Sequence, residues 1–263
     1  MLIFGSITTL ILGLAIGSFL NVLIYRLPKG ESIWRQARSY CPHCNSWLGA
    51  LELIPVVSFL WLQGMCLHCK KKISWQYPVV ELLTAVLFVL VFWRDGGSIS
   101  TYDSLLLMVR DFIFVASLIV IFMIDWKHML ILDKVVYPLM PIIFVINWAL
   151  AGWQWGAAGD LLLAGLIGFM FYFVQYQLSQ GRWVGGGDMK LAALLGLMFG
   201  VRDLLVLLFI AYVGGAIISL WLVAFKKKGL KSAVPMAVFL VPAAWVTLFF
   251  GNQIVVWYLS MFL

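Results

Sequence analysis

Eight apolar segments dominate the sequence, and most of them approach or exceed the length needed to cross a lipid bilayer. They lie at residues 2–24, 78–93, 104–124, 135–152, 159–178, 190–200, 203–225 and 234–262. A transmembrane helix needs about 20 apolar residues. The chain is 64% hydrophobic and 11% charged, whereas a soluble domain is about half apolar and one quarter charged. The sequence therefore predicts an all-α polytopic membrane protein with about eight transmembrane helices, and it argues against a soluble protein with a very apolar core.

Basic residues are distributed unevenly between the two sides that these segments define. If the N-terminus lies outside, only Arg94, Arg110 and Arg202 of the 18 basic residues fall on the outer side. Lys and Arg collect on cytoplasmic loops. The pattern predicts an N-terminus outside, and it explains the net charge of +7 without nucleic acid. The first segment has no basic stretch before it and no convincing cleavage site, so we expect a transmembrane helix there and not a signal peptide.

One loop, residues 25–77, is much longer than the others and predicts a small cytoplasmic domain. This gives a first helix at 1–24, the domain at 25–77 and a helical bundle at 78–263. The run "LIPVVSFLWL" inside the loop is too short to span a bilayer. We interpret it as the core or the membrane-facing side of the domain.

All four cysteines lie in this loop as two C-x-x-C pairs, Cys41 with Cys44 and Cys66 with Cys69. Two such pairs are a strong signature of zinc. Four thiolates complete a tetrahedral Zn²⁺ site with no open position, so the site is expected to be structural. Two disulfides or free thiols are the alternatives, and the reducing cytoplasm argues against disulfides. His43 and His68 lie within the pairs and are less favoured as ligands.

Two acids occupy the cytoplasmic ends of predicted helices. Asp125 ends the run "DFIFVASLIVIFMID", and Asp188 opens "GGGDMKLAALLGLMFG". Two carboxylates brought together repel if both are ionised, so a pair holds one proton between them. Such a pair suits peptide hydrolysis, because one acid can take a proton from water while the other polarises the carbonyl. From position alone, Asp188 could equally be a helix N-cap.

Other residues near these acids are weaker candidates. Gly185, Gly186 and Gly187 lack side chains and could let a substrate backbone approach. Glu81 lies one turn inside the second apolar segment, where it could serve the site, pair with a basic residue or make a helix contact. Gly165 and Gly168 suggest close contact between helices.

The ordered motifs extend this interpretation. "GSFLNVLIYRLP", the two cysteine pairs, "PVVELLTA", "IDWKHMLILD", "GGGDMKLAALLGLMFG" and "VPMAVFLVPAAW" follow one another over nearly the whole chain. This order resembles the bacterial type IV prepilin peptidase family of GxGD aspartic proteases. The resemblance implies an intramembrane-type aspartic endopeptidase of eight helices in the bacterial inner membrane, which cuts leader peptides at the cytoplasmic face.

The resemblance also implies roles for particular residues. The first catalytic acid of the family opens a D-x6-P-D pattern, which gives Asp125 here, with Asp133 as the trailing acid and Leu132 in place of the usual proline. The second catalytic acid is that of GxGD, here Asp188. Lys190 follows it as in GxGDxK, with a substrate-facing or lipid-facing role.

Cofactors and partners follow from the same resemblance. Family members with the cysteine domain often also methylate the new N-terminus with S-adenosylmethionine, although the sequence has no GxGxG fingerprint for that cofactor. The expected partners are prepilin and pseudopilin precursors and membrane lipid, with no nucleic acid and no stated oligomeric state. A different GxGD intramembrane protease and a non-enzymatic membrane assembly factor with a zinc module remain alternatives.

Overall fold

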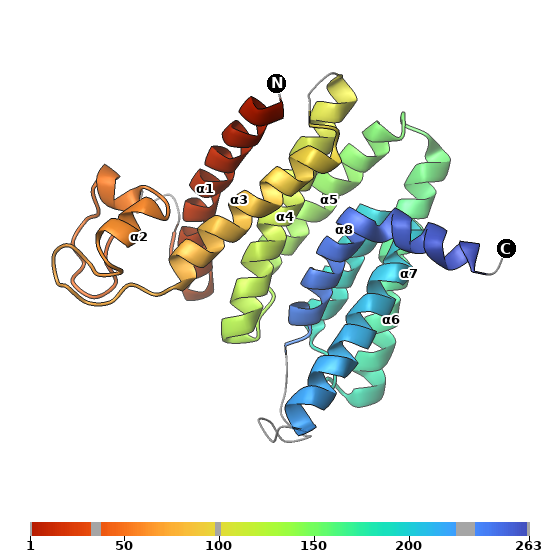
Figure 1. The fold of residues 1–263 in the computed structure, drawn as a ribbon. Coiled ribbons are helices and arrows are strands. Elements are labelled where there is room, and N and C mark those ends of the chain that lie inside the picture. Colours follow the sequence, from red (N-terminus) through yellow and green to blue (C-terminus); the bar gives the residue numbers. More distant parts are fainter. Residues whose placement is uncertain (1, 33–37, 98–100, 225–234, 262–263) are drawn as a thin grey trace. The chain divides into compact units, whose positions relative to one another are not determined.

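The computed structural model describes residues 2–32, 38–97, 101–224 and 235–261, and the long elements within these ranges are helices (Figure 1). Seven helices within these ranges are long and apolar enough to cross a membrane. The elements are α1 (Leu2–Arg26), η1 (Leu27–Lys29), η2 (Ala50–Leu53), α2 (Val57–Trp61), α3 (Gln76–Arg94), α4 (Tyr102–His128), α5 (Asp133–Leu150), α6 (Trp155–Ser179), α7 (Gly186–Ala224) and α8 (Ala237–Ser260). Among the described residues, β pairing is limited to two isolated bridges. The predicted all-α class is confirmed. Arg35 and the basic residues of 226–231, which entered the topology argument, lie outside the described residues.

The chain divides into two compact units, Met1–Met123 and Ile124–Leu263, and the boundary falls near the end of α4. The first unit holds α1, the cysteine loop, α3 and most of α4. The second holds the last turn of α4 with α5 to α8.

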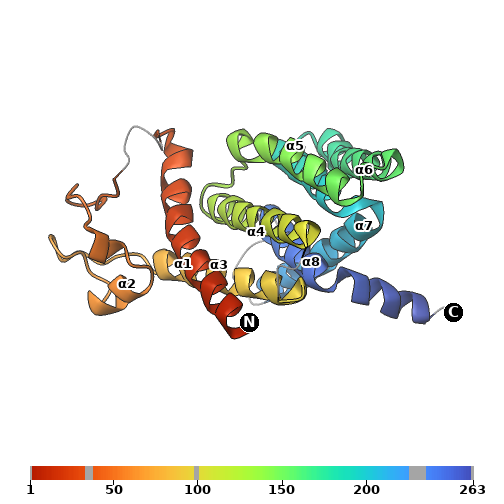
Figure 2. The same ribbon diagram turned by 90° about the horizontal axis from the view of Figure 1, so that it is seen from above.

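Small residues bring α1 and α3 together in the first unit (Figures 1 and 2). A Cβ on Gly13 would lie 2.5 Å from Cα of Ala85, and one on Gly17 would lie 2.7 Å from Cα of Glu81. Contacts that advance along α1 therefore step backward along α3, as in an antiparallel pair. Glycines at such positions let two backbones approach where side chains would hold them apart.

Glycines also allow close contact between α6 and the first part of α7 in the second unit. Gly168 lies on the backbone of Ala192, and Gly196 lies on the backbone of Ala164. Gly165 contacts the side chain of Leu197. The predicted close helix contact at Gly165 and Gly168 is confirmed.

The chain reverses direction at Gly200, inside α7. Gly200 has φ 73° and ψ 176°, a backbone conformation that favours glycine. Beside it, Asp160 near the start of α6 accepts a hydrogen bond from the N–H of Val201 at 3.4 Å. Farther on, the hydroxyl of Tyr212 donates to Gln175 near the end of α6 at 2.7 Å. Both arms of α7 therefore run along α6, the first antiparallel to it and the second parallel.

This turn explains the number of helices. Two apolar segments, 190–200 and 203–225, were expected as separate helices. They form the two arms of α7, so the eight expected apolar segments correspond to seven long helices in the part of the chain that the structure describes. Helix α8 then follows the second arm, because Phe239 contacts Gly215 and Gly251 approaches Asp203.

Candidate active site and metal centre

Asp125 lies in the last turn of α4, where its side chain is only 4% exposed. Its Oδ2 accepts a hydrogen bond from the backbone N–H of Ala237, the first residue of α8, at 3.1 Å. The first N–H groups of a helix have no partner within the helix. The start of α8 therefore supplies a donor to a carboxyl group that has little contact with water.

Asp188 is placed in a similar way at the start of α7. It is 7% exposed, and its Oδ2 accepts the backbone N–H of Gly185 at 2.9 Å. Asp188 is the third residue of the helix and not its N-cap, but its carboxylate reaches back to secure the turn that precedes the helix. The capping interpretation is therefore correct in part. The hydrogen bond from Gly185 uses one of the two carboxylate oxygens of Asp188.

The two acids lie at the same end of the second unit. The Asp125 carboxylate is close enough to Asp188 for the two charges to act on one another. The helices bring together side chains that the sequence separates, because α4 ends and α7 and α8 begin at this end of the unit. Each acid already has a backbone N–H donor.

Asp133 and Lys190 form an ion pair at this end. Lys190 Nζ lies 2.7 Å from Asp133 Oδ1, and the two side chains are 28% and 52% exposed. Lys190 also lies over the ring of Tyr137, 5.2 Å from its centroid. The pair ties the start of α5 to the start of α7. Asp133 therefore has an ionic partner, whereas Asp125 and Asp188 form no ion pair with the part of the chain that the structure describes.

The loop between α4 and α5 packs against the glycine turn. A Cβ on Gly187 would lie 2.7 Å from Cβ of Ile131, so the room at this glycine is taken by the protein itself. A Cβ on Gly186 would meet only Cε of Met189, at 3.8 Å, and Gly185 is exposed. Leu132, where a proline was expected, has φ −82° and caps α5 in an extended conformation close to the one that proline adopts.

Glu81 lies in the first unit, on α3. Its Oε2 accepts the backbone N–H of Val56 at 2.8 Å, and the side chain is 6% exposed. Ser18 of α1 lies near this carboxylate. Glu81 thus joins the cysteine loop to α1 and α3, and its suggested role near the acid pair stays a prediction.

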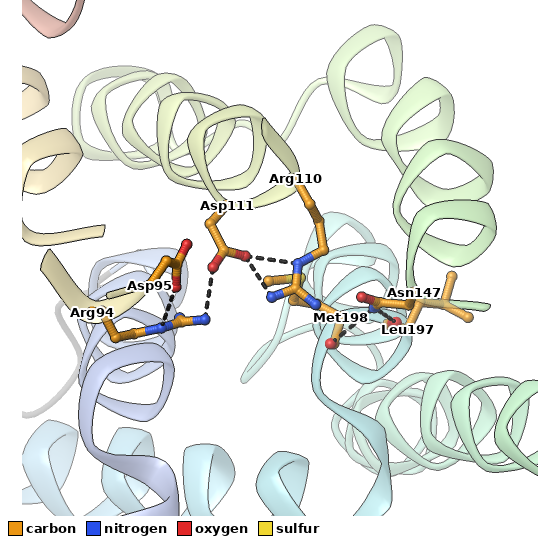
Figure 3. Close-up of polar contacts among 7 residues, drawn as sticks. All are labelled: Arg94, Asp95, Arg110, Asp111, Asn147, Leu197 and Met198. Carbon is orange, nitrogen blue, oxygen red and sulfur yellow. Dashed lines mark hydrogen bonds and ion pairs between the residues drawn. The ribbon is translucent and has the colours of Figure 1, made fainter. Parts of the chain in front are cut away.

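The sequence interpretation gave Asp111 no special role, but this residue is completely buried in α4. Figure 3 shows its carboxylate between Arg94, at 2.8 Å, and Arg110, at 2.7 Å. Asp95 pairs with Arg94 at 3.1 Å, and burial raises the pKa of Asp95 to about 6, with the Arg94 charge opposing that shift. The sequence contains one indication of this network: the adjacent charges in "VRDF" lie inside an apolar segment, and charged residues within a membrane need partners.

The four cysteines converge in the loop of the first unit. The Sγ atoms of Cys41, Cys44, Cys66 and Cys69 all lie within 4.8 Å of one another. Thiolates about 2.3 Å from one tetrahedral metal are separated by just under 4 Å, and Cys41 Sγ and Cys69 Sγ are 4.0 Å apart. Two isolated bridges, Tyr40 with Trp47 and Met65 with Lys72, close the two turns that carry the pairs. The cluster could therefore hold a metal ion.

The thiols of this cluster differ in their acidity. Hydrogen bonds from Ser46 lower the pKa of Cys44 to about 6, and backbone N–H groups, that of Cys69 first, lower the pKa of Cys66. The N–H of Lys71 favours the thiolate of Cys69, but burial and the three neighbouring thiols raise its pKa to about 11. Four thiols this close resist becoming anionic together, and a bound cation removes that resistance.

Helices able to span a membrane, a four-cysteine cluster between the first two of them, and two buried aspartates at helix ends define a class of multi-pass membrane protein. Comparison of the sequence with known proteins identifies that class more closely. Residues 11–95 match the bacterial peptidase A24 N-terminal domain, and residues 112–220 match the type IV leader peptidase family. This chain belongs to the type IV leader peptidase family.

Curated relatives extend the similarity to nearly the full length. A protein of Aeromonas hydrophila named prepilin leader peptidase/N-methyltransferase is 33% identical, with 95% of this chain and 92% of the relative covered. Proteins with the same name are 33% identical in Stutzerimonas stutzeri, at the same coverage, and 30% identical in Legionella pneumophila, with 94% and 92% covered. No solved structure matches the chain.

Proposed function

We propose that this chain is an aspartic endopeptidase that removes the leader peptides of type IV prepilins and of type II pseudopilins. The carrying observation is that Asp125 and Asp188 lie at one end of the second unit, near enough for their charges to interact, each buried and each bonded to a backbone N–H. The family of the chain and the names of its relatives support this function.

The two carboxyl groups divide the reaction between them. With one proton shared by the pair, the ionised acid accepts a proton from water, and the resulting oxygen nucleophile adds to the scissile carbonyl carbon. The protonated acid donates to the carbonyl oxygen. Collapse of the tetrahedral intermediate breaks the C–N bond, and the amine leaves with a proton from the acid that accepted one from water. Burial strengthens each of these interactions.

The active site faces the cytoplasm of the bacterial inner membrane in this proposal, with the N-terminus outside. The basic residues that flank the passes support this orientation, because the acid end carries Lys127, Lys134, Arg182 and Lys190. Arg202, which lies at the opposite end of the second unit beside Asn252, is one of the three basic residues assigned to the outer side.

The cysteine cluster holds Zn²⁺ as a structural ion in this proposal. Four thiolates satisfy its tetrahedral preference and leave no position for water, so the ion supplies folding free energy to the loop and takes no part in cleavage. N-methylation of the new N-terminus with S-adenosylmethionine rests on the names of the relatives. The sequence offers no glycine-rich GxGxG fingerprint for that cofactor.

Membrane lipid is a further partner of the cysteine loop in this proposal. Leu51, Leu60 and Trp61 at its tip are 79%, 65% and 84% exposed. The bond from Val56 to Glu81 fixes this part of the loop at the second turn of α3, a helix that is long and apolar enough to cross a membrane. Lys70 to Lys72 are also exposed on the loop and can contact anionic headgroups.

A spin label would test this contact. A nitroxide attached to a non-natural residue at position 61, in nanodiscs, should be more accessible to oxygen than to a water-soluble nickel complex. The same label at position 45, where Asn45 is exposed beside Cys44, should show the reverse. Equal accessibility to the nickel complex at both positions would refute lipid contact.

The peptidase proposal is tested by Asp125→Asn and Asp188→Asn, co-expressed with a tagged prepilin. The amide oxygen of Asn can still accept the bonds from Ala237 and Gly185, so both variants should insert and fold. We expect leader removal to fall at least 1,000-fold, since the proton-transferring group is lost. Retained cleavage in either variant would overturn the proposal, and the N-terminal mass of the wild-type product reports methylation.

A further inference from the structure

Tyr172 on α6 carries a buried hydroxyl that the proposed reaction does not yet use. The residue is 0% exposed, and its hydroxyl has no hydrogen-bond partner of ordinary geometry among the described residues. Leaving a buried hydroxyl unpaired costs free energy comparable to a lost hydrogen bond. Each such group in a native structure therefore calls for an explanation.

The register of α6 and the first arm of α7 places Tyr172 opposite Asp188. Ala164 contacts Gly196, and one turn farther along α6, Gly168 contacts Ala192. The next step of this antiparallel register pairs Tyr172 with Asp188. The charge of Asp188 acts on the Tyr172 hydroxyl, as this placement requires.

A second tyrosine in the same region differs from Tyr172 in the hydrogen bonding of its hydroxyl. Tyr212, on the second arm of α7, lies beside Tyr172 with 6.3 Å between the ring centroids. Its hydroxyl donates to Gln175 Oε1 at 2.7 Å, and its side chain is 37% exposed. The proton of Tyr212 is therefore engaged by Gln175, so toward Tyr172 its hydroxyl can act only as an acceptor. The Tyr172 hydroxyl lies beside that of Tyr212 without forming a hydrogen bond of full geometry, and its proton can turn to an acceptor at the acid pair.

We propose that the Tyr172 hydroxyl is a third catalytic group, which donates a hydrogen bond to the scissile carbonyl oxygen beside Asp188. This inference rests on the proposed peptidase function. As water adds to the carbonyl carbon, the C=O π electrons move to this oxygen, and the hydroxyl stabilises the developing charge without transferring its own proton. Proton transfer stays with the two aspartates, so the products are unchanged.

A pre-placed donor of this kind acts on the transition state more than on the bound substrate. Removing one donor to a developing oxyanion typically lowers kcat by 100- to 1,000-fold. Because the ground-state carbonyl gains little from the same bond, KM should change little. A residue that only fills space between α6 and α7 would show neither pattern, since phenylalanine fills that space equally well.

The test compares Tyr172→Phe with Tyr212→Phe in the purified full-length chain, with a prepilin as substrate. Each change removes one hydroxyl oxygen. We expect Tyr172→Phe to lower kcat about 100-fold with KM within about threefold, and Tyr212→Phe to keep kcat within about twofold of wild type. The affinity for uncut prepilin should be equal in Asp125→Asn and in Asp125→Asn combined with Tyr172→Phe.

Three results would overturn the inference. The first is a kcat of Tyr172→Phe within about threefold of wild type while Asp188→Asn is inactive, which removes the role of Tyr172 and leaves the peptidase function standing. The second is an equal loss in both tyrosine variants, which indicates general disturbance of the packing. The third is a wild-type chain that does not cut prepilin, in which case the peptidase function and this inference fail together.

Discussion

Replacing Glu81 should release the cysteine loop from the membrane helices while leaving the acid pair intact. The perturbation is Glu81→Ala, which removes the acceptor of the Val56 N–H from a site where Glu81 is only 6% exposed. A hydrogen bond to a buried charged group contributes about 1.5–3 kcal/mol. At tenfold per 1.4 kcal/mol, a loss of about 2 kcal/mol makes local opening about 30-fold more frequent.

The amide of Val56 reports that opening directly. Hydrogen exchange of the peptide that contains Val56 should accelerate about 30-fold in Glu81→Ala, since exchange follows the population of locally open states. Glu81→Gln is the matched control: its side-chain carbonyl can still accept the bond, so the loss should be under about 1 kcal/mol and exchange should accelerate less than about fivefold. Prepilin cleavage should persist in Glu81→Gln.

Two results would refute this reasoning. Unchanged protection of Val56 in Glu81→Ala would mean that the bond does not hold the loop. Loss of cleavage in Glu81→Gln with Val56 still protected would mean that the charge of Glu81 serves the reaction, as the sequence first suggested.

Three further predictions address the metal, a buried acid and helix packing. Cys66→Ser should reduce bound zinc from about one ion per chain to near zero by elemental analysis, whereas His43→Ala should leave it unchanged, because the four thiolates complete the site; equal zinc in both variants would refute a four-cysteine site. Burial raises the folded-state pKa of Asp95 to about 6, above its unfolded value near 3.9, so the folded state binds more protons between pH 4 and 6. The free energy of unfolding should therefore fall by about 2–3 kcal/mol as pH rises through that window. Asp95→Asn should flatten this fall when melting temperature is measured against pH, and an unchanged slope would contradict the prediction. Gly168→Ala should lower the free energy of unfolding by about 1–3 kcal/mol, because its Cβ would lie 2.5 Å from the carbonyl oxygen of Ala192. Gly159→Ala on the same helix meets open space and should be neutral or stabilising by up to about 1 kcal/mol. Equal melting temperatures of the two variants would show that α6 and α7 are not packed as described.

The features that could be predicted from the sequence are those that local chemistry determines. An apolar run in a bilayer must satisfy its own backbone hydrogen bonds, so its length predicts a helix wherever it occurs. The spacing of Cys41 with Cys44 and of Cys66 with Cys69 likewise predicted a shared cluster, because thiols on two short turns can meet around one ion. The break near Gly200 was also predicted, since the expected segments ended and began on either side of it.

What could not be predicted depends on partners that are distant in the chain. The backbone donor for Asp125 comes from Ala237, 112 positions away, and no local pattern around Asp125 indicates it. Tyr172 looks like any aromatic residue of an apolar helix until the contact of Gly168 with Ala192 sets the register opposite Asp188. Burial of Asp111 depends in part on Arg94 of another helix. These three features appear only once the helices are packed.

Three buried aspartates in this chain are stabilised in two different ways, and the difference agrees with the roles proposed for them. Asp111 lies between two arginines, which are charged at all accessible pH values and form ion pairs with it. Asp125 and Asp188 instead accept backbone N–H groups at the starts of α8 and α7, which are dipoles without a net charge. A dipole can stabilise a carboxylate and still let it accept a proton at modest cost, whereas a pair of arginines opposes protonation strongly. Peptide hydrolysis requires each acid to gain and lose a proton in every cycle. The absence of an ion pair with Lys or Arg at Asp125 and Asp188, among the described residues, is therefore as important to the proposal as their proximity.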